Sequence, residues 1–460
     1  MKVLLIFPNR GVVTGEPPIG LGYIAACLRQ KQVAVDLLDM TFAPSFARAQ
    51  RVMEAAKPDI VGIYASTVML KDSYAAARLA RQCSAKLVVL GGPHASVLPE
   101  ETLRAADADA LVAGEGEWAF TEIAERFRAS GGLPDLRGIP GVYVKIQGQV
   151  TGNSERRFIK DLDTLPLPAR DLFDMRRYGK HWFQLDGAGS NLVGTNIVTS
   201  RGCPFSCSFC QPTLQSVFGA PHRRRSPENI VKELAALKAE YGLSAVQIVD
   251  DLFFIDSAYI EAFCRQMLES KLGIVWGAQS RVDTVPDDRL LDRAYRAGLR
   301  LISLGIESGA SRVIKLYDKR IHIDQVNAAV DRIRAHRIKT RGFFIIGAPT
   351  ESIAEIKQTI DFAVASRLDE AAFSVLTPLP GTHIHALAKA NGWEVTQDWG
   401  YEHYYAKGGF LSGALPESVI RRYQRLAFLR FYLHPSRAPY LLNSLLSPRR
   451  AVTKLKCYFT

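Results

Sequence analysis

The sequence contains no run of roughly eighteen apolar residues, the length that a helix needs to cross a membrane. Its first residues, MKVLLIFPNRG, lead directly into a strand and a turn, without the apolar stretch and cleavage site of a secretory signal peptide. The seven cysteines are an odd number and are scattered apart from one triplet, which argues against a disulfide framework. We therefore predict a cytoplasmic, unprocessed protein.

Acidic residues are absent from the C-terminal part of the chain. Residues 421–460 contain nine Lys or Arg and no Asp or Glu, so they carry most of the formal net charge of +12. The remaining residues hold 49 basic and 46 acidic side chains. Because a nucleic-acid groove needs an excess of basic residues along a binding face, this distribution predicts no nucleic-acid partner.

The cysteine triplet has the spacing C-x-x-x-C-x-x-C and lies directly after an apolar run, Asn196–Ser200. Thiolates from Cys203, Cys207 and Cys210 can hold three irons of a 4Fe–4S cluster, which leaves the fourth iron without a protein ligand and free to bind a small molecule. A zinc site would need a fourth Cys or His, and His222 is not at a usual finger spacing. The triplet therefore predicts an iron–sulfur cluster with an open iron.

Together with Phe209, these three cysteines resemble the signature of radical S-adenosylmethionine (SAM) enzymes. The resemblance implies that the open iron binds the amino and carboxylate groups of SAM. It also implies that one-electron reduction, by a flavodoxin or ferredoxin-type donor, releases a 5′-deoxyadenosyl radical. In the family the residue at the position of Phe209 usually lies against the adenine.

The other cysteines exclude two neighbouring groups of that family. Methylthiotransferases carry a second cysteine triplet near the N-terminus, where this chain has only Cys27 and Cys83. Enzymes with auxiliary C-terminal clusters need several late cysteines, and only Cys264 and Cys457 follow the triplet.

The first 135 residues alternate strand-like and helical segments, which predicts a doubly wound, Rossmann-like α/β sheet with ligands at the carboxyl ends of its strands. The strand-like runs are Val3–Phe7, Val33–Leu38, Ile60–Tyr64, Lys86–Leu90 and Ala110–Val112. Helical stretches such as Leu21–Gln30 and Ser73–Cys83 lie between them.

The segments PPIGLGYIAACLR, PDIVGIYAST, VVLGGPHAS and VAGEGE resemble the cobalamin-binding domain that precedes the radical domain in one subclass of the family. The resemblance implies cobalamin contacts from Ser66, Thr67, Gly91, Gly92, Pro93, His94, Gly114 and Glu115. The axial motif D-x-H-x-x-G is missing, and members without it bind cobalamin with no histidine below the cobalt. We therefore expect His94 to lie in a turn or near the nucleotide tail. Taken singly, each segment is also consistent with an ordinary βα turn.

Residues 136–190 are predicted to be a linker, in which PGVYVKIQGQV indicates a hairpin and LDTLPLPARDLFD a proline-punctuated connection. Its aromatic part, Tyr178, His181, Trp182 and Phe183, is a candidate lining for a substrate channel.

Residues 191–400 contain six strand–helix units, which predict a partial (β/α)6 TIM barrel. The strands are expected at Asn196–Ser200, Ala245–Val249, Ile274–Ala278, Leu301–Gly305, Gly342–Ile346 and Ala371–Leu376. By resemblance, Glu307, Ser280 and Arg281 contact the ribose and methionine parts of SAM, Asp250 and Asp251 meet its amino group, and Gly347 lies against adenine. The alternatives are a helix N-cap for the aspartates and a surface ion pair for Arg281.

Residues 401–460 are predicted to be a basic, amphipathic helical region. Ile420, Tyr423, Ala427 and Phe431 fall on one helical stripe, and an apolar segment at Tyr440–Leu446 is followed by basic residues. This pattern fits a peripheral contact with the inner face of a membrane or a helix that closes the bottom of the barrel.

The combined expectations describe a cobalamin-dependent radical SAM enzyme, with a 4Fe–4S cluster, SAM and cobalamin as cofactors. By resemblance it methylates an unactivated carbon of a hydrophobic small molecule or lipid. An oxidative cyclisation or rearrangement on the same cofactors, and a corrinoid or iron–sulfur sensor without turnover, are the alternatives.

Overall fold

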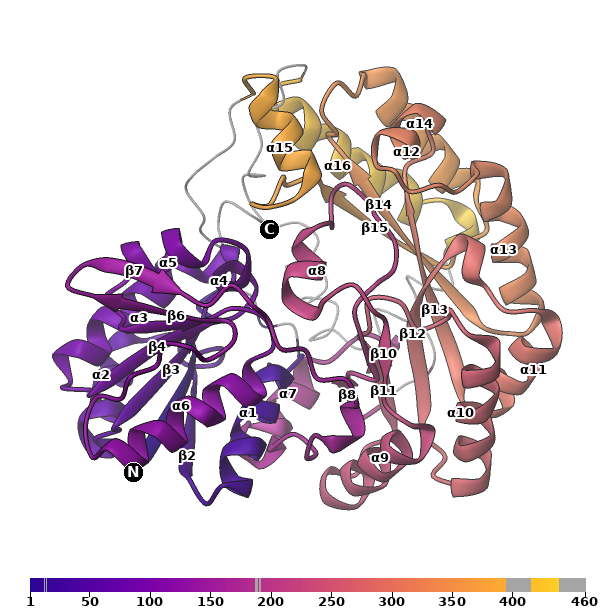
Figure 1. The fold of residues 1–460 in the computed structure, drawn as a ribbon. Helices are drawn as coiled ribbons and strands as arrows, with labels where there is room; N and C mark the ends of the chain where they lie inside the picture. The colour runs from indigo at the N-terminus through magenta and orange to yellow at the C-terminus, as the bar shows by residue number, and fades with distance from the viewer. Residues whose placement is uncertain (12, 14, 187–188, 190–191, 394–414, 438–460) are drawn as a thin grey trace.

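The structure is a computed structural model that describes residues 1–11, 13, 15–186, 189, 192–393 and 415–437. Two α/β domains follow each other along the chain, with the first domain on the left of Figure 1 and the second on the right. The predicted fold class, a doubly wound sheet followed by a partial barrel and a C-terminal helix, is confirmed.

The first sheet has seven strands in the spatial order β2-β1-β3-β4-β5-β6-β7. Its strands are β1 (Lys2–Phe7), β2 (Ala34–Asp39), β3 (Ile60–Tyr64), β4 (Leu87–Gly91), β5 (Ala110–Val112), β6 (Val142–Ile146) and β7 (Gln149–Gly152). β1 to β5 are parallel, and β1 pairs with both β2 and β3, so the strand order reverses at the β1–β3 boundary. A ligand site is expected at the carboxyl ends of the strands beside such a boundary.

Helices cover both faces of this sheet, which is why β1 is apolar from Val3 to Phe7. Leu5 packs into the cluster with α1 and α6, whereas its neighbour Leu4 packs into the cluster on the other face. The helices of this domain are α1 (Ile19–Gln30), α2 (Phe46–Ala56), α3 (Leu70–Gln82), α4 (Pro93–Val97), α5 (Pro99–Ala105) and α6 (Gly116–Ser130).

The predicted hairpin forms β6 and β7, and β6 pairs antiparallel with β5. The first sheet therefore continues beyond residue 135 into the range that the sequence assigned to a linker. In the same range, Trp182, which follows α7 (Met175–His181), is fully buried, and its ring occupies the space where Gly194 has no side chain. This aromatic segment packs the domains together and, among the described residues, lines neither of the cavities below.

The second sheet has six parallel strands in the order β15-β14-β13-β12-β11-β8, which is the sequence order and gives an open barrel. Its strands are β8 (Gly194–Ile197), β11 (Ala245–Ile248), β12 (Val275–Arg281), β13 (Leu299–Glu307), β14 (Lys339–Ile346) and β15 (Glu370–Val375). A two-stranded ribbon, β9 (Ser200–Arg201) with β10 (Arg223–Arg224), frames the cysteine loop.

The outer helices of the barrel are α9 (Pro227–Tyr241), α10 (Ser257–Ser270), α11 (Asp288–Arg296), α12 (Ser311–Leu316), α13 (Ile323–Ala335) and α14 (Ile353–Ala365). Two further helices are α8 (Thr213–Phe218), after the cysteine loop, and α15 (His383–Ala390). The N-cap of α9 is Ser226, whose side chain accepts a hydrogen bond from the Asn229 N–H, and Pro227 holds the first helical position.

The C-terminal helix α16 (Glu417–Tyr432) packs on β15 and α14. Ile420, Ala427 and Phe431 are buried in the barrel core, so this stripe packs on the barrel, which is the second of the two alternatives that the sequence left open. Packing against β15 removes the apolar surface of these side chains from water, which stabilises the packed position of α16. The segment Tyr440–Leu446 lies outside the described residues.

Candidate functional site

A cavity of about 440 Å³ opens at the carboxyl ends of the barrel strands, and we call it the cysteine cavity. Its lining includes Cys203, Phe205, Cys207, Phe209, Cys210, Leu214, Asp251, Gln279, Ser280, Arg281, Ser303, Gly305, Glu307, Lys319 and Phe343. The structure thus brings together the three cysteines and five of the predicted SAM contacts, from the cysteine loop, β12, β13 and the turn after β11.

Two predicted SAM contacts do not line this cavity. Asp250 is buried, and its carboxylate accepts hydrogen bonds from the Thr199 N–H at 2.7 Å and the Ser200 hydroxyl at 2.7 Å. Gly347 faces the side chain of Ile420, which lies about 3.0 Å from where a Cβ would be. In this structure Asp250 anchors the start of the cysteine loop and Gly347 lets α16 approach the end of β14.

Asp251, by contrast, reaches the cavity because consecutive side chains after a strand point in opposite directions. Burial, with a smaller contribution from the Asp250 carboxylate, raises the pKa of Asp251 to about 6. It is a carboxylate set to accept a hydrogen bond from a cationic ligand.

The three thiols fit a polynuclear cluster. Burial raises the pKa of the Cys203 and Cys207 thiols, so without a metal these two stay protonated. Arg281 places Nη1 3.7 Å from Cys207 Sγ, where its charge favours a thiolate. No group of three or more His, Cys, Asp or Glu among the described residues converges on a point that could hold one metal ion. Because the three cysteines line one cavity, they can offer one thiolate to each of three irons of a cluster.

Lys319 is a member of this site that no sequence motif indicated. It is 6% exposed, and its ammonium donates to Glu307 Oε1 at 2.6 Å. Gly305 makes room for the pair, since a Cβ there would lie 2.7 Å from both Glu307 Oε1 and Lys319 Nζ. Glu307 itself has a left-handed φ of +70°, next to an irregularity in the β13–β14 pairing. Such strain in a non-glycine residue is a feature of functional sites.

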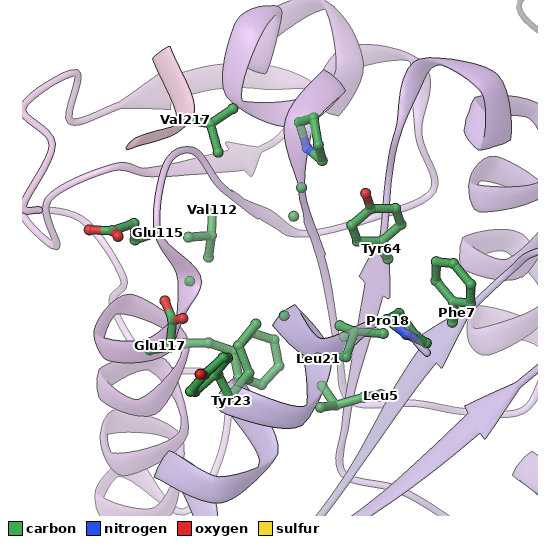
Figure 2. Close-up of a pocket in the computed structure, with 18 of the residues that line it drawn as sticks. Leu5, Phe7, Pro18, Leu21, Tyr23, Tyr64, Val112, Glu115, Glu117 and Val217 are labelled. Carbon is green, nitrogen blue, oxygen red and sulfur yellow. The ribbon is translucent and has the colours of Figure 1, made fainter. Parts of the chain in front are cut away.

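A second cavity, of about 430 Å³, lies at the carboxyl ends of β1, β3, β4 and β5, and we call it the interdomain cavity. Figure 2 shows Leu5, Leu21, Tyr23 and Tyr64 around it, with Val217 at the side opposite Leu5. Five of the predicted cobalamin contacts line it: Gly91, Gly92, Pro93, Gly114 and Glu115. The wall is mostly apolar, and at its glycines it is bare backbone; a Cβ on Gly91 would meet nothing nearer than 3.7 Å. Such a wall fits a large flat ligand.

Ser66, Thr67 and His94 are not among the described lining residues of either cavity. His94 is 5% exposed, and its Nδ1 lies 3.0 Å from the Thr67 hydroxyl. Burial lowers the pKa of His94 to about 4, so the imidazole is neutral at pH 7. His94 is thus a buried histidine in the first turn of α4, where the sequence predicted a turn or a contact with the nucleotide tail.

Glu115 has a structural role that links the two domains. Its carboxylate accepts from Arg201 Nη1 at 2.6 Å, Arg223 Nη1 at 2.8 Å and the Ile159 N–H at 2.7 Å. Arg201 also pairs with Glu117 at 2.5 Å, and all four charged side chains are at most 9% exposed. The two arginines lie just before and just after the cysteine loop, so this cluster fixes the loop against the first domain.

The short helix α8 lies between the two cavities. Leu214 lines the cysteine cavity, whereas Val217 and Phe218 line the interdomain cavity. Figure 1 shows α8 between the two domains, and Arg156 holds it there by donating to the carbonyl oxygens of Ser216 and Ser96. Ligands in the two cavities would therefore lie on opposite sides of this six-residue helix.

Comparison with known proteins identifies the class of both domains. A B12-binding domain model matches residues 11–124, and a radical SAM superfamily model matches residues 197–363. The chain therefore belongs to the radical SAM enzymes that carry an N-terminal cobalamin-binding domain. The predicted family, and the cofactor set of 4Fe–4S cluster, SAM and cobalamin, are confirmed at this level.

Individual relatives extend over nearly the whole chain. The uncharacterized methyltransferase PH0819 of Pyrococcus horikoshii is 33% identical over 444 residues, which cover 95% of this chain and 93% of that protein. The anaerobic magnesium-protoporphyrin IX monomethyl ester cyclase of Rubrivivax gelatinosus is 28% identical over 393 residues, covering 83% of this chain and 68% of the cyclase. The structure of the radical enzyme OxsB with aqua-cobalamin and SAM matches with a TM-score of 0.74 at 16% identity, covering 99% of this chain and 72% of OxsB.

Proposed function

We propose that this protein transfers a methyl group to an unactivated carbon of a hydrophobic small molecule. The observation that carries the proposal is the pair of cavities on either side of α8, one lined by three thiols and the other by glycine and apolar residues. When bound, the cluster with SAM supplies a 5′-deoxyadenosyl radical, and the corrinoid supplies the methyl group.

The chain's own residues bind the cofactors, orient the substrate and exclude water from the site. Cys203, Cys207 and Cys210 hold the cluster, and the Glu307 carboxylate and the Ser280 hydroxyl offer acceptors for the ribose hydroxyls. Asp251 accepts from the amino group of SAM. No side chain acts as a general base in this proposal, because the reacting C–H bond is broken by a radical and not by proton transfer.

One of the relatives supports a hydrophobic substrate. The cyclase relative is named for a magnesium-protoporphyrin ester, a large and largely apolar ring. We infer a substrate that lies near Val217 and Phe218, between a corrinoid in the interdomain cavity and SAM in the cysteine cavity. An electron donor of the flavodoxin or ferredoxin type remains part of the proposal, since the radical step consumes one electron.

The test is anaerobic reconstitution with iron, sulfide, a corrinoid, SAM and a reductant, with Cys210→Ala as the control. Formation of 5′-deoxyadenosine above the Cys210→Ala level supports the enzyme, and equal levels favour a sensor without turnover. With a candidate substrate, a product that is heavier by one methylene supports methylation. A product that has lost hydrogen without gaining carbon favours the oxidative cyclisation that the cyclase relative suggests.

We also infer a peripheral contact between α16 and an anionic membrane. No helix among the described residues is long and apolar enough to cross one. Leu426, Leu429 and Leu433 are 38%, 51% and 70% exposed, and their spacing puts them on one side of the helix. The exposed residues Arg422 and Arg425 stand beside them, and residues 421–460 contain no Asp or Glu. Leucines flanked by arginines suit an anionic lipid surface.

Sedimentation with anionic liposomes tests this contact. The triple variant Leu426→Gln, Leu429→Gln and Leu433→Gln should lose most of the binding, whereas Leu268→Gln, which changes a 39% exposed leucine on α10, should keep it. Unchanged binding of the triple variant would end the idea.

A further inference from the structure

Four polar side chains, one from each of four neighbouring strands, lie on the inner wall of the barrel. They are Asn196 on β8, Gln247 on β11, Gln279 on β12 and Ser303 on β13, and we call them the polar row. Asn196 is the register partner of Gln247, and Gln279 is that of Ser303. The inner layers of a small barrel are usually filled by branched apolar side chains instead. The apolar neighbours of the row in sequence pack on the opposite side, under the outer helices: Ile197, Ile248, Ala278 and Ile302.

The polar row extends from one cavity to the other. Asn196 lines the interdomain cavity, whereas Gln279 and Ser303 line the cysteine cavity. Gln247 has room between them because its partner on β12 is Gly277, where a Cβ would lie 2.8 Å from Gln247 Oε1. A molecule held between a corrinoid in the first cavity and SAM in the second would therefore lie along the row.

Three members of the row carry polar atoms that find no hydrogen-bond partner among the described residues: Asn196 Oδ1, Gln247 Oε1 and Ser303 Oγ. Their residues are only 6%, 4% and 1% exposed. The two amides are oriented by their nitrogens, since Asn196 Nδ2 donates to the Pro17 carbonyl at 3.5 Å and Gln247 Nε2 to the Ile248 carbonyl at 3.2 Å. An unpaired buried polar atom costs folding free energy, so three in one row need a function other than packing.

The charged side chains beside the row are paired with one another. Arg341, the register partner of Ser303 on β14, donates to the Glu370 carboxylate at 2.8 Å and to Gln184 Oε1 at 2.9 Å. Gln184 in turn donates to Glu16 Oε1 at 2.9 Å. The unpaired amide oxygens can only accept a hydrogen bond, and a serine hydroxyl can accept or donate one. This set of atoms fits a neutral group that donates a hydrogen bond.

We propose that the polar row binds an uncharged hydroxyl or amide group of the substrate and thereby selects the carbon that faces the two cofactors. The proposal rests on the proposed function, because it takes the substrate to lie between SAM and the corrinoid. It narrows the substrate to a hydrophobic molecule with a neutral hydrogen-bond donor. Neighbouring strands are about 4.8 Å apart, so Asn196 and Gln247 can accept from one group. Ser303 binds the part of the molecule nearer the cysteine cavity.

The experiment compares two probes that differ in one donor: phenol, which has a hydroxyl, and anisole, its methyl ether, which can only accept. Their dissociation constants are measured by ligand-observed NMR on protein loaded with cluster, SAM and hydroxocobalamin. The preference for phenol over anisole should fall by about 3- to 10-fold in the double variant Asn196→Leu and Gln247→Met, the range for a neutral hydrogen bond. Asn327→Ala, which changes an exposed asparagine on α13, should leave the preference at the wild-type value.

An unchanged preference in the double variant would overturn the proposal, because the hydroxyl would then be bound elsewhere. Ser303→Ala, which removes a single oxygen, replaces the double variant if that protein does not fold, and it should lower the preference in the same direction. Urea unfolding of the cofactor-free protein gives a second readout. A row that serves a ligand should leave the unfolding midpoint of Ser303→Ala unchanged or raised, whereas a lowered midpoint would mean that the hydroxyl serves the fold.

The readout is binding and not turnover. Failure to form 5′-deoxyadenosine would count against the proposed function and leave the preference for phenol standing. Loss of that preference would count against the polar row and leave methyl transfer standing.

Discussion

Replacing Glu115 by Gln tests whether this side chain serves the domain interface or the corrinoid. The sequence resemblance assigned Glu115 to cobalamin, whereas the structure gives its carboxylate to Arg201, Arg223 and the Ile159 N–H. The amide in the Glu115→Gln variant would keep one acceptor oxygen and lose the charge, leaving Arg223 buried without a carboxylate partner.

Removing one member of a buried ion pair costs about 3–5 kcal/mol. We expect the lower end, about 3 kcal/mol, because Arg201 retains its bond to Glu117. Urea unfolding of the protein without added corrinoid, followed by tryptophan fluorescence, measures this loss directly. Glu122→Gln on the same helix is the matched control: its pair with Arg126 is 37% to 40% exposed, and such pairs contribute less than about 1 kcal/mol.

If Glu115→Gln unfolded with the same free energy as the wild type, the structural role of Glu115 at the domain interface would be refuted. If that variant instead bound the corrinoid more weakly with its stability unchanged, the direct contact implied by the resemblance would be correct.

Three further predictions use the same kinds of assay. Burial lowers the pKa of His94 from 6.5 to about 4, so as the pH falls the unfolded chain takes up a proton on His94 before the folded chain does. Between pH 7 and 4.5 the free energy of unfolding, measured in urea, should therefore fall by about 2 kcal/mol more in the wild type than in His94→Asn. An equal fall in both proteins would contradict the burial of His94. Gly305→Ala should weaken SAM binding by displacing the Glu307–Lys319 pair, while Gly179→Ala, where a Cβ meets nothing within 4 Å, should not change it. Asp250→Asn should lower the free energy of unfolding by about 1–3 kcal/mol with little change in SAM affinity, because the Asp250 carboxylate accepts hydrogen bonds from Thr199 and Ser200. Asp251→Asn should lower the affinity for SAM, because Asp251 lines the cysteine cavity. The opposite pattern would mean that the two side chains exchange roles.

Local patterns in the sequence determined much of this molecule. The cysteine spacing predicted the cluster loop because three cysteines within eight residues stay close together, and the structure places all three in the lining of one cavity. The first sheet was predictable because a parallel strand covered on both faces is mostly apolar, as at Leu4 and Leu5. Family resemblance then added Phe209, Arg281 and Glu307, and the structure gathers all three in one cavity.

The direction of individual side chains was decided only in three dimensions. Asp250 and Asp251 are adjacent and chemically identical, yet one is buried beneath the cysteine loop and the other faces the cavity. The stripe through Ile420 and Phe431 is amphipathic in either a membrane-bound or a packed helix, and the open face of β15 selects packing. Periodicity shows which residues share a face but not what that face meets.

Tertiary structure alone also decided the long-range charge pairs. Glu115 and Arg223 are separated by 108 positions, and nothing local in either segment predicts their contact. Lys319 lies in the sequence LYDKR, which is typical of a solvent-exposed turn, and only the left-handed backbone at its two neighbours points it into the cavity. Sequence determines which elements form because that choice depends on near neighbours, whereas the pairing of charges depends on where distant elements meet.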